Sequence, residues 1–243
     1  MDNSDLKIVV IYHKKYPTHP GLLFEPNLYV PILGGHAVFG IKPFIKGMLT
    51  DDVGDNISWA NPYLNEVTSM YWIWKHPEAI GNPKFIGFQH YRRFFLPKDI
   101  NEVFNGKIVI NKEIEGFNEI DVLETAFGLK ISNLIVDIFD KSFGKEQVKL
   151  HELFIEFMNL NWQYNREMFV CPWYIFDLLM QYLLKILKIA IPHAKLEYDL
   201  AVRYRNLSYI LECLIGFYFY MIMKCNIYKV HETSCKYFIP KGY

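Results

Sequence analysis

FIGFQHYRRFF, residues Phe85–Phe95, is the stretch that decides how this chain folds. It opens with an apolar run, Phe85–Phe88, which predicts a buried β-strand. The run stops abruptly at residues 89–93, Gln-His-Tyr-Arg-Arg. Ligands bind at strand ends in α/β proteins, because the side chains there leave the sheet and face a crevice. We therefore expect a ligand site at this strand end.

Three side chains at this end, His90, Arg92 and Arg93, can carry positive charge. Arginine has a fixed charge and a planar set of donors that binds phosphate through two parallel hydrogen bonds. Histidine adds a donor that titrates near neutral pH. The group predicts an anion site, and the alternative interpretation is a solvated turn or an ion-pair cluster around acidic residues.

A second buried strand is predicted at Leu6–Tyr12, a continuous run of apolar and β-branched residues typical of the centre of a parallel sheet. His13 and Lys14 follow directly, either as ligand contacts or as the start of a solvated loop. We expect Leu6–Tyr12 and Phe85–Phe88 to be adjacent or nearly adjacent parallel strands. His13 and His90 should then open onto one crevice.

The composition fits a single folded domain. Of the 243 residues, 51% are hydrophobic and 17% aromatic, which is ample for a core and argues against disorder. The net charge is zero, with 26 basic and 26 acidic residues, so a general nucleic-acid binder is not expected. The cysteines form no CxxC pair, which argues against a zinc site or disulfide framework and favours a reducing compartment.

The sequence shows neither a signal peptide nor a clear membrane span. The N-terminus lacks a long apolar region after a charged start. The longest apolar stretch, Leu207–Met223, is interrupted by Glu212 and is shorter than the roughly 20 residues that a span needs. We interpret it as a buried helix and expect a cytoplasmic protein.

A polar loop, residues 51–58, precedes the clearest helix. Its Asp, Asn and Ser side chains form turns with their own backbone or accept hydrogen bonds from a ribose or base, and we expect both roles. In the helix, Asn61 serves as the cap, and one apolar stripe contains Tyr63, Val67, Met70, Tyr71 and Trp74. Glu66 lies off that stripe and faces either the site or water.

The remaining pattern indicates an α/β fold with a helix-rich C-terminal part. Further strands are expected at Leu28–Leu33, Lys107–Ile110 and Met168–Val170, with an edge strand at Val230–Phe238. Further helices are expected at Glu146–Asn159, at Trp173–Ala190, ended by Pro192, and at Arg205–Lys224. Residues 113–145 give mixed signals and receive no assignment.

Several motifs carry a family resemblance. They are Tyr12-His13-Lys14, Asp52–Ser58, Asn61, Glu66-Val67-Thr68, Tyr71–Lys75, Ile86–Phe95, Met168-Phe169-Val170, Ile175-Phe176-Asp177 and Glu212-Cys213-Leu214. Through them the chain resembles a bacterial glycosyltransferase-like domain family of capsular and exopolysaccharide gene clusters, formerly a domain of unknown function. Two departures stand out: the family usually has Asn where this chain has Glu167, and residues 113–150 do not match its middle region.

The family is similar to GT-A-type glycosyltransferases, so the resemblance implies a GT-A-like nucleotide-sugar-binding sheet with flanking helices. It implies one domain, residues 1–243, with a nucleotide-sugar-binding half at 1–112 and a helix-rich acceptor half at 113–243. The implied activity is hexosyl transfer from a nucleotide sugar, expected to be a UDP-sugar, to a glycan acceptor in capsule, exopolysaccharide or O-antigen synthesis. The implied donor-binding residues are His13, Lys14, Asp52, Asp55, Asn56, His90, Arg92 and Arg93.

GT-A enzymes commonly hold a divalent metal on the donor diphosphate through an Asp-x-Asp motif at a strand end. Here residues 85–95 contain His90, Arg92 and Arg93 but no Asp or Glu. Either a metal or fixed cations can stabilise the leaving diphosphate, so we expect donor binding without a metal cofactor. The alternative is magnesium or manganese held by the carboxylates of residues 51–55.

An inverting enzyme also needs a base for the acceptor hydroxyl. Glu212 is one candidate, because it is a lone acid in an apolar helix, where burial raises the pKa of a carboxyl group. The alternative is that Glu212 pairs with Arg203 or Arg205. Glu66 is the second catalytic candidate, and Asp55 is a further one.

The expected partners follow from the implied activity. Acceptors of capsule-type enzymes are usually lipid-linked glycans, so we expect peripheral contact with the inner membrane face through residues near Lys224–Lys241. The alternative function is a non-catalytic glycan- or nucleotide-binding module, because abundant aromatic side chains suit sugar stacking. A phosphoryl-transfer enzyme is not expected, since the sequence has no Walker-type loop.

Overall fold

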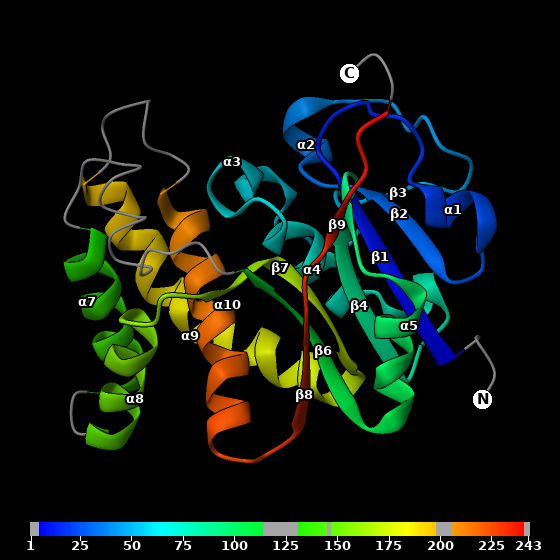
Figure 1. Cartoon of the computed structure of the whole chain (residues 1–243). Helices are drawn as coiled ribbons and strands as arrows, with labels where there is room; N and C mark the ends of the chain where they lie inside the picture. Colours follow the sequence, from blue (N-terminus) through cyan, green and yellow to red (C-terminus); the bar gives the residue numbers. More distant parts are fainter. Residues whose placement is uncertain (1–4, 114–130, 145–146, 198–205, 241–243) are drawn as a thin grey trace.

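The protein is described by a computed structural model that covers residues 5–113, 131–144, 147–197 and 206–240 (Figure 1). Its centre is a mixed sheet of nine strands in the order β3-β2-β1-β4-β7-β6-β8, and β5 and β9 continue from β4. The fold is α/β with a helix-rich C-terminal part, as predicted from the sequence.

The centre of the sheet confirms the predicted strand pair. β1 (Leu6–Tyr12) and β4 (Phe85–His90) are adjacent and parallel, and their register pairs Ile11 with His90. β2 (Tyr29–Leu33) and β3 (Leu49–Thr50) extend the parallel part beyond β1. β4 runs two residues past the predicted Phe88, so His90 is its last residue.

The other strands come mainly from the second half of the chain. β7 (Gln163–Pro172) is antiparallel to both β4 and β6 (Lys107–Glu113). β8 (Lys229–Thr233) lies parallel to β6, and the two-residue strands β5 (Arg93–Phe94) and β9 (Lys236–Tyr237) pair with each other. The predicted nucleotide-sugar half and acceptor half therefore contribute to one sheet.

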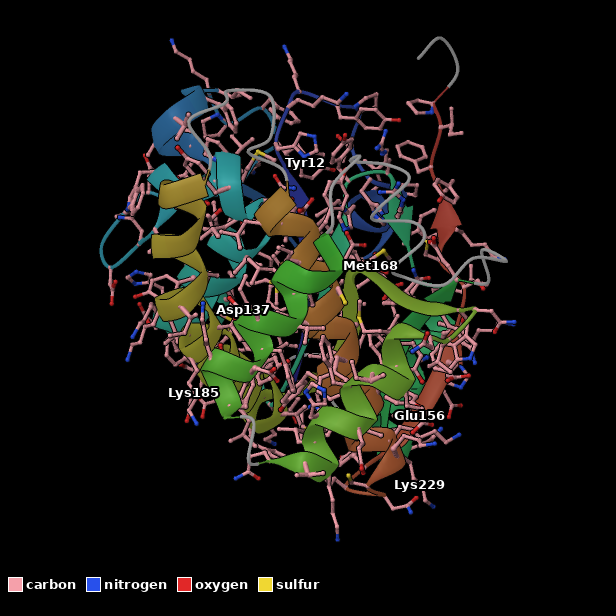
Figure 2. The ribbon with its side chains drawn as sticks, turned by 90° about the vertical axis from the view of Figure 1, so that its left-hand side faces the viewer. Tyr12, Asp137, Glu156, Met168, Lys185 and Lys229 are labelled. Carbon is pink, nitrogen blue, oxygen red and sulfur yellow. The ribbon has the colours of Figure 1, made fainter. Side chains whose placement is uncertain are left out.

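Helices cover both faces of the sheet (Figure 1). The α-helices are α1 (Pro20–Phe24), α2 (His36–Phe39), α3 (Asn61–Leu64), α4 (Val67–Lys75), α5 (Pro97–Ile100), α7 (Ile131–Phe143), α8 (Val148–Met158), α9 (Trp173–Glu197) and α10 (Asn206–Lys224). One core joins the sheet to α4 and α7–α10, and the other lies on the opposite face with α1 and α5. Viewed from the helical side, α7 and α8 lie in front of α10 (Figure 2).

The helix predicted after the polar loop is interrupted. α3 ends at Leu64, Asn65 adopts φ 43° and ψ −122°, and α4 starts at Val67. The side chain of Asn61 donates to the carbonyl of Asn65 at 2.8 Å, which satisfies a backbone group at the break. The predicted stripe is only partly correct, because Val67 is fully buried whereas Tyr63 is 36% exposed.

Two other helices refine the predictions. α9 continues to Glu197, so the prediction that Pro192 ends it is wrong. α10 is long and apolar enough to cross a membrane by length and composition, but 72% of its Leu207–Lys224 window is buried inside the protein. Such burial is typical of a core helix, as predicted. The four cysteines are free thiols.

Candidate active site

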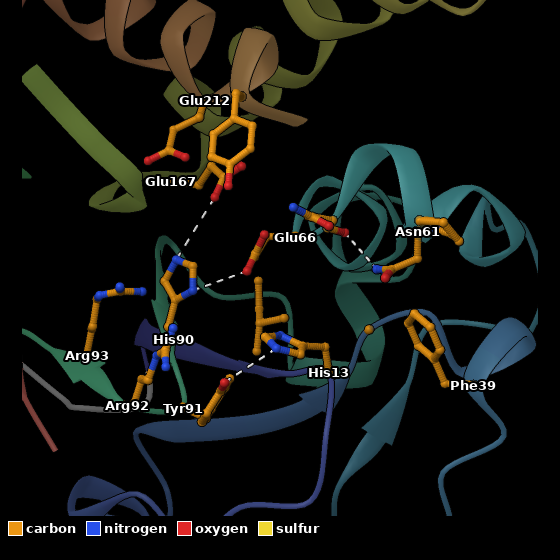
Figure 3. A pocket seen from close by; sticks show the side chains of 15 residues that line it. His13, Phe39, Asn61, Glu66, His90, Tyr91, Arg92, Arg93, Glu167 and Glu212 are labelled. Carbon is orange, nitrogen blue, oxygen red and sulfur yellow. Dashed lines mark hydrogen bonds and ion pairs between the residues drawn. The ribbon is translucent and has the colours of Figure 1, made fainter. Parts of the chain in front are cut away.

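A pocket of about 380 Å³ opens where β1 and β4 end (Figure 3). Its lining is rich in charged and polar side chains. It consists of Ile11, His13, Gly34, Phe39, Asn61, Pro62, Asn65, Glu66, His90, Tyr91, Arg92, Arg93, Glu167, Tyr209 and Glu212. The pocket thus lies at the carboxyl edge of parallel strands, where α/β proteins bind ligands.

The pairing of β1 with β4 explains why His13 and His90 share this pocket. Ile11 pairs with His90, so His13 follows β1 at the same edge of the sheet. Side chains alternate along a strand, which places His90 on the same face as the buried Phe88, toward the helical core. The hydroxyl of Tyr91 lies 3.4 Å from Nε2 of His13, and the two rings meet edge to face.

His90 lies between two carboxylates (Figure 3). Its Nδ1 is 3.2 Å from Oε1 of Glu66, and its Nε2 is 4.0 Å from Oε2 of Glu167. All three side chains are largely buried, with 10%, 12% and 4% of their surfaces exposed for His90, Glu66 and Glu167. The imidazole therefore has an acid facing each of its nitrogens.

Glu66 is held in place by the break between α3 and α4. It precedes α4 directly, and the hydrogen bond from Asn61 to Asn65 fixes the turn before it. Burial alone would raise the pKa of Glu66, but the charge and hydrogen bond of His90, helped by the charge of His13, lower it to about 2. Glu66 is therefore ionised at neutral pH and faces the site, not water.

Glu167 enters the pocket from an irregular part of β7. Ile110 pairs with Phe169 and Lys112 with Tyr164, so one residue of β6 stands opposite four residues of β7, 165–168. Bulges of this kind redirect side chains, and they occur often beside active sites. Glu167 itself has φ 46°, in the left-handed region that residues with side chains seldom adopt.

The two arginines line the opposite side of the pocket (Figure 3). The guanidinium of Arg92 lies 5.7 Å from the ring centre of Tyr91, and that of Arg93 lies 5.2 Å from the ring centre of Tyr237 in β9. The buried Nε of Arg93 has no hydrogen-bond partner among the described residues. Both arginines thus present donors where an anionic ligand would bind.

Glu212, a catalytic candidate from the sequence, lines the pocket. It projects from α10 together with Tyr209, near Glu167 and away from Arg92 (Figure 3). The alternative partners Arg203 and Arg205 lie outside the described residues. Cationic side chains and carboxylates therefore line different sides of one cavity.

The polar loop at residues 51–58 has a mainly structural role. Asp51 is fully buried, and its carboxylate accepts hydrogen bonds from the backbone N–H groups of Gly35 and His36 and from the hydroxyls of Ser58 and Thr68. The loop also contains an Asx turn, one of its two expected roles, in which Oδ1 of Asn56 accepts a hydrogen bond from the N–H of Ser58.

Four predicted donor-binding residues, Lys14, Asp52, Asp55 and Asn56, do not line this pocket. Asp52 contacts Nδ1 of His36 at 2.7 Å, and Asp55 accepts a hydrogen bond from the hydroxyl of Tyr71. These side chains therefore lie outside the His90 pocket, and whether they bind the donor stays a prediction. A nucleoside contact by Asp55 and Asn56 stays a prediction from the sequence.

Carboxylates are close to the end of β4 in space, although none is close in sequence. Glu66, His90 and Glu167 each offer one ligand atom, and these atoms lie within 4.8 Å of one another. This group has the ligand types that hold a divalent cation. The sequence argument about a metal considered residues 85–95 and the carboxylates of residues 51–55, and it missed Glu66 and Glu167.

Glu167 is the main site residue that sequence reasoning missed, along with Phe39, Asn61 and Tyr209. The departure from the family's usual Asn was the one signal that pointed to Glu167. Neither its positive φ nor the bulge is readable from the sequence, because both depend on the pairing of β7 with β6.

A comparison with solved structures defines the class of fold. The chain superposes on WbbM, described as a bifunctional glycosyltransferase in its apo form, with a TM-score of 0.75 and 20% sequence identity. The match covers 97% of this chain but 46% of the WbbM chain, so this chain spans less than half of that protein. The α/β fold thus resembles that of a solved glycosyltransferase.

The sequence comparison then gives the family. The family model DUF4422, a domain of unknown function, matches residues 7–223, and the chain belongs to this family. The family inferred from the motifs is thereby confirmed, and its capsule and exopolysaccharide setting stays a prediction. A comparison with curated proteins finds no match.

Proposed function

We propose that this domain transfers a sugar from a nucleotide sugar to a hydroxyl of a glycan acceptor. One observation carries the proposal: a single pocket at the carboxyl edge of β1 and β4 has Arg92 and Arg93 on one side and Glu167 and Glu212 on the other. The glycosyltransferase-type fold supports it. An anionic donor and a hydroxyl acceptor need these two kinds of surface.

The cationic side suits the donor. Arg92, Arg93 and His13 would bind the diphosphate and stabilise the negative charge that develops as it leaves. His90 has a different place from the one expected, because both of its nitrogens face carboxylates. We assign it to the boundary between donor and acceptor. A UDP-sugar and hexosyl transfer are the donor and reaction that we propose.

The acidic side suits the acceptor. An acceptor hydroxyl must lose a proton when it attacks the sugar, and a carboxylate positioned beside it can take that proton. Glu66 and Glu212, the two catalytic candidates from the sequence, both line the pocket. Glu167 joins them as a third candidate.

We further propose that donor binding does not require a divalent metal. Glu66 already contacts His90, and the positive charges of Arg92 and Arg93 line the same pocket and would repel a cation. The test compares transfer rates in excess EDTA with rates in added magnesium or manganese. If activity is lost in EDTA and restored by added metal, a bound metal and not the arginines would be the group that binds the diphosphate.

The cellular setting that we propose is capsule, exopolysaccharide or O-antigen synthesis at the cytoplasmic face of the inner membrane. The acceptor would be lipid-linked, and basic and aromatic residues near Lys224–Lys241 would contact the membrane peripherally. Sedimentation with vesicles that carry a lipid-linked glycan tests this contact. A protein that stays in the supernatant would rule it out.

The decisive experiment incubates the protein with a panel of nucleotide sugars and glycan acceptors and measures released nucleoside diphosphate. Acceptor-dependent release supports a transferase. Saturable binding without any turnover would instead support a glycan- or nucleotide-binding module. The abundant aromatic residues favour this second function, because aromatic side chains stack on sugars.

A further inference from the structure

Three carboxylates line the pocket, and each of them is a candidate to take the acceptor's proton. Glu66 contacts His90, Glu167 enters from the bulge of β7, and Glu212 projects from α10. The inference below rests on the proposed transfer reaction and asks which of these groups acts as its base.

Glu66 is poorly suited to that task. Its carboxylate is committed to Nδ1 of His90 at 3.2 Å, so it is not available to an acceptor hydroxyl in the same way as the other two acids. A buried carboxylate behind an imidazole instead fixes the orientation and charge of the ring. Glu66 is therefore a positioning residue that acts through His90.

Glu167 occupies a place that the fold maintains at a cost. A non-glycine residue at positive φ is strained, and such strain persists only where the surrounding structure enforces it. The same segment interrupts the regular pairing of β6 with β7. This backbone geometry directs the buried carboxylate of Glu167 toward His90, and 4% of the side chain is exposed.

The distance between Glu167 and His90 fits a hydroxyl group. At 4.0 Å, Oε2 of Glu167 and Nε2 of His90 are too far apart for a direct hydrogen bond. One oxygen atom placed to the side can lie about 2.8 Å from both, which is hydrogen-bonding distance. A hydroxyl there would donate its proton to the Glu167 carboxylate while it contacts Nε2 of His90.

Glu212 is less constrained. It is only partly buried, and it extends from a regular helix with no bulge or strained backbone dihedral at its position. It is better placed to bind other hydroxyls of a polyhydroxylated acceptor. The three acids then have separate tasks: orienting His90, taking the proton, and holding the acceptor.

We propose that Glu167 is the general base and that the attacking hydroxyl binds between Glu167 and His90. As the acceptor oxygen forms its bond to the anomeric carbon, the bond from that carbon to the phosphate oxygen breaks. The electron pair of the broken bond leaves with the nucleoside diphosphate, beside Arg92 and Arg93. The hydroxyl proton moves to the Glu167 carboxylate. Attack from the side opposite the leaving group inverts the anomeric configuration.

The first test is Glu167→Gln, which keeps the size of the side chain and removes its basicity. We expect kcat to fall about 10²–10⁴-fold, the usual contribution of a general base, while the affinity for UDP changes less than threefold. Glu156→Gln serves as the matched control, since Glu156 is exposed on α8 and does not line the pocket. Unchanged kcat in Glu167→Gln would overturn the assignment.

Folding of the variant must be separated from chemistry. Glu167→Asn provides a second variant, because Asn tolerates positive φ better than other residues that carry a side chain beyond Cβ. It should bind UDP normally and show the same loss of kcat. A Glu167→Asn variant with wild-type kcat would also overturn the assignment.

Azide separates a base from a residue that merely positions the acceptor. Azide is already an anion and needs no base, so Glu167→Ala with azide should form the inverted glycosyl azide and release nucleoside diphosphate at a restored rate. The same rescue confined to Glu212→Ala would move the base to Glu212. If the wild-type enzyme requires added metal and Glu167→Gln does not respond to metal, Glu167 would be a metal ligand and not the base.

If the wild-type protein transfers no sugar from any donor, the proposed function itself fails.

Discussion

Two acidic clusters lie close to the end of β1, and they differ in what surrounds their side chains. Asp51 accepts bonds from Gly35, His36, Ser58 and Thr68, all of them parts of the protein. The cluster around His90 pairs Glu66 with His90 and also lines a cavity that a ligand can fill. The first cluster holds the fold together and the second is built for a ligand.

The two clusters are also connected. Thr68 donates to Asp51 and accepts from Asn61, and Asn61 also donates to the carbonyl of Asn65 at the turn before Glu66. The buried network thus supports the backbone that carries Glu66 to His90. A polar cluster in a sequence indicates neither role by itself, and its hydrogen-bond partners decide between them.

Asp51→Ala should have the largest effect on stability and provides the first test of this contrast. It removes a buried carboxylate and leaves two backbone N–H groups and two hydroxyls without their acceptor. We expect the free energy of unfolding to fall by about 3–4 kcal/mol, measured by urea denaturation. A loss below about 1 kcal/mol would show that the loop does not have the structural role assigned to it.

A second test concerns His19, a histidine that is buried away from the pocket. Burial lowers the pKa of His19 from 6.5 to about 4, so the unfolded chain binds a proton more readily than the folded one between these values. The folded state should therefore lose up to about 3 kcal/mol as the pH falls from 6.5 to 4. Above pH 6.5 this contribution is fully present.

His19→Asn isolates that effect. Asn can still accept the hydrogen bond that Nδ1 of His19 receives from the N–H of Gly21, but it does not titrate. The variant's free energy of unfolding, measured between pH 7 and pH 4.5, should vary less with pH than that of the wild type. Equal slopes in the two proteins would refute the proposed role of His19.

Arg92→Ala and Arg93→Ala test the ligand side of the comparison. Each removes charge-assisted hydrogen bonds worth roughly 1.5–3 kcal/mol, so UDP affinity should fall about 10- to 100-fold, measured by calorimetry. The free energy of unfolding should change by less than about 1 kcal/mol, in contrast to Asp51→Ala. Lysine at either position should restore the affinity only partly, because the paired donors are lost. Unchanged UDP affinity in both alanine variants would exclude the cationic side as the diphosphate site.

Apolar periodicity was enough to predict the centre of the fold. The runs Leu6–Tyr12 and Phe85–Phe88 are apolar apart from Lys7, which predicts buried strands, and the two strands lie side by side at the centre of the sheet. Their ends then brought His13 and His90 together, as predicted. The local sequence pattern predicts an element correctly where burial of apolar side chains is the dominant interaction.

The bulge before Phe169 could not be predicted, because it depends on the pairing of β7 with β6, which lies far away in sequence. Glu167 is a site residue because that pairing redirects it. The break at Asn65 and the continuation of α9 past Pro192 were also not predicted. The sequence did not show that Tyr71 lies beside Asp55, whose contact with the nucleoside stays a prediction.

Asp55→Asn has the smallest expected effect and sharpens the boundary between the two clusters. Asp55 accepts a hydrogen bond from Tyr71 and lies 3.8 Å from Lys75, and its side chain is 58% exposed. Exposed pairs of this kind contribute little, so the free energy of unfolding should fall by less than about 0.5 kcal/mol. The pocket geometry predicts that UDP affinity changes less than threefold, since Asp55 is not part of the lining. A tenfold loss of UDP affinity with unchanged stability would instead show that residues 51–58 contact the nucleoside, and the loop would then belong to the ligand site as well as to the fold.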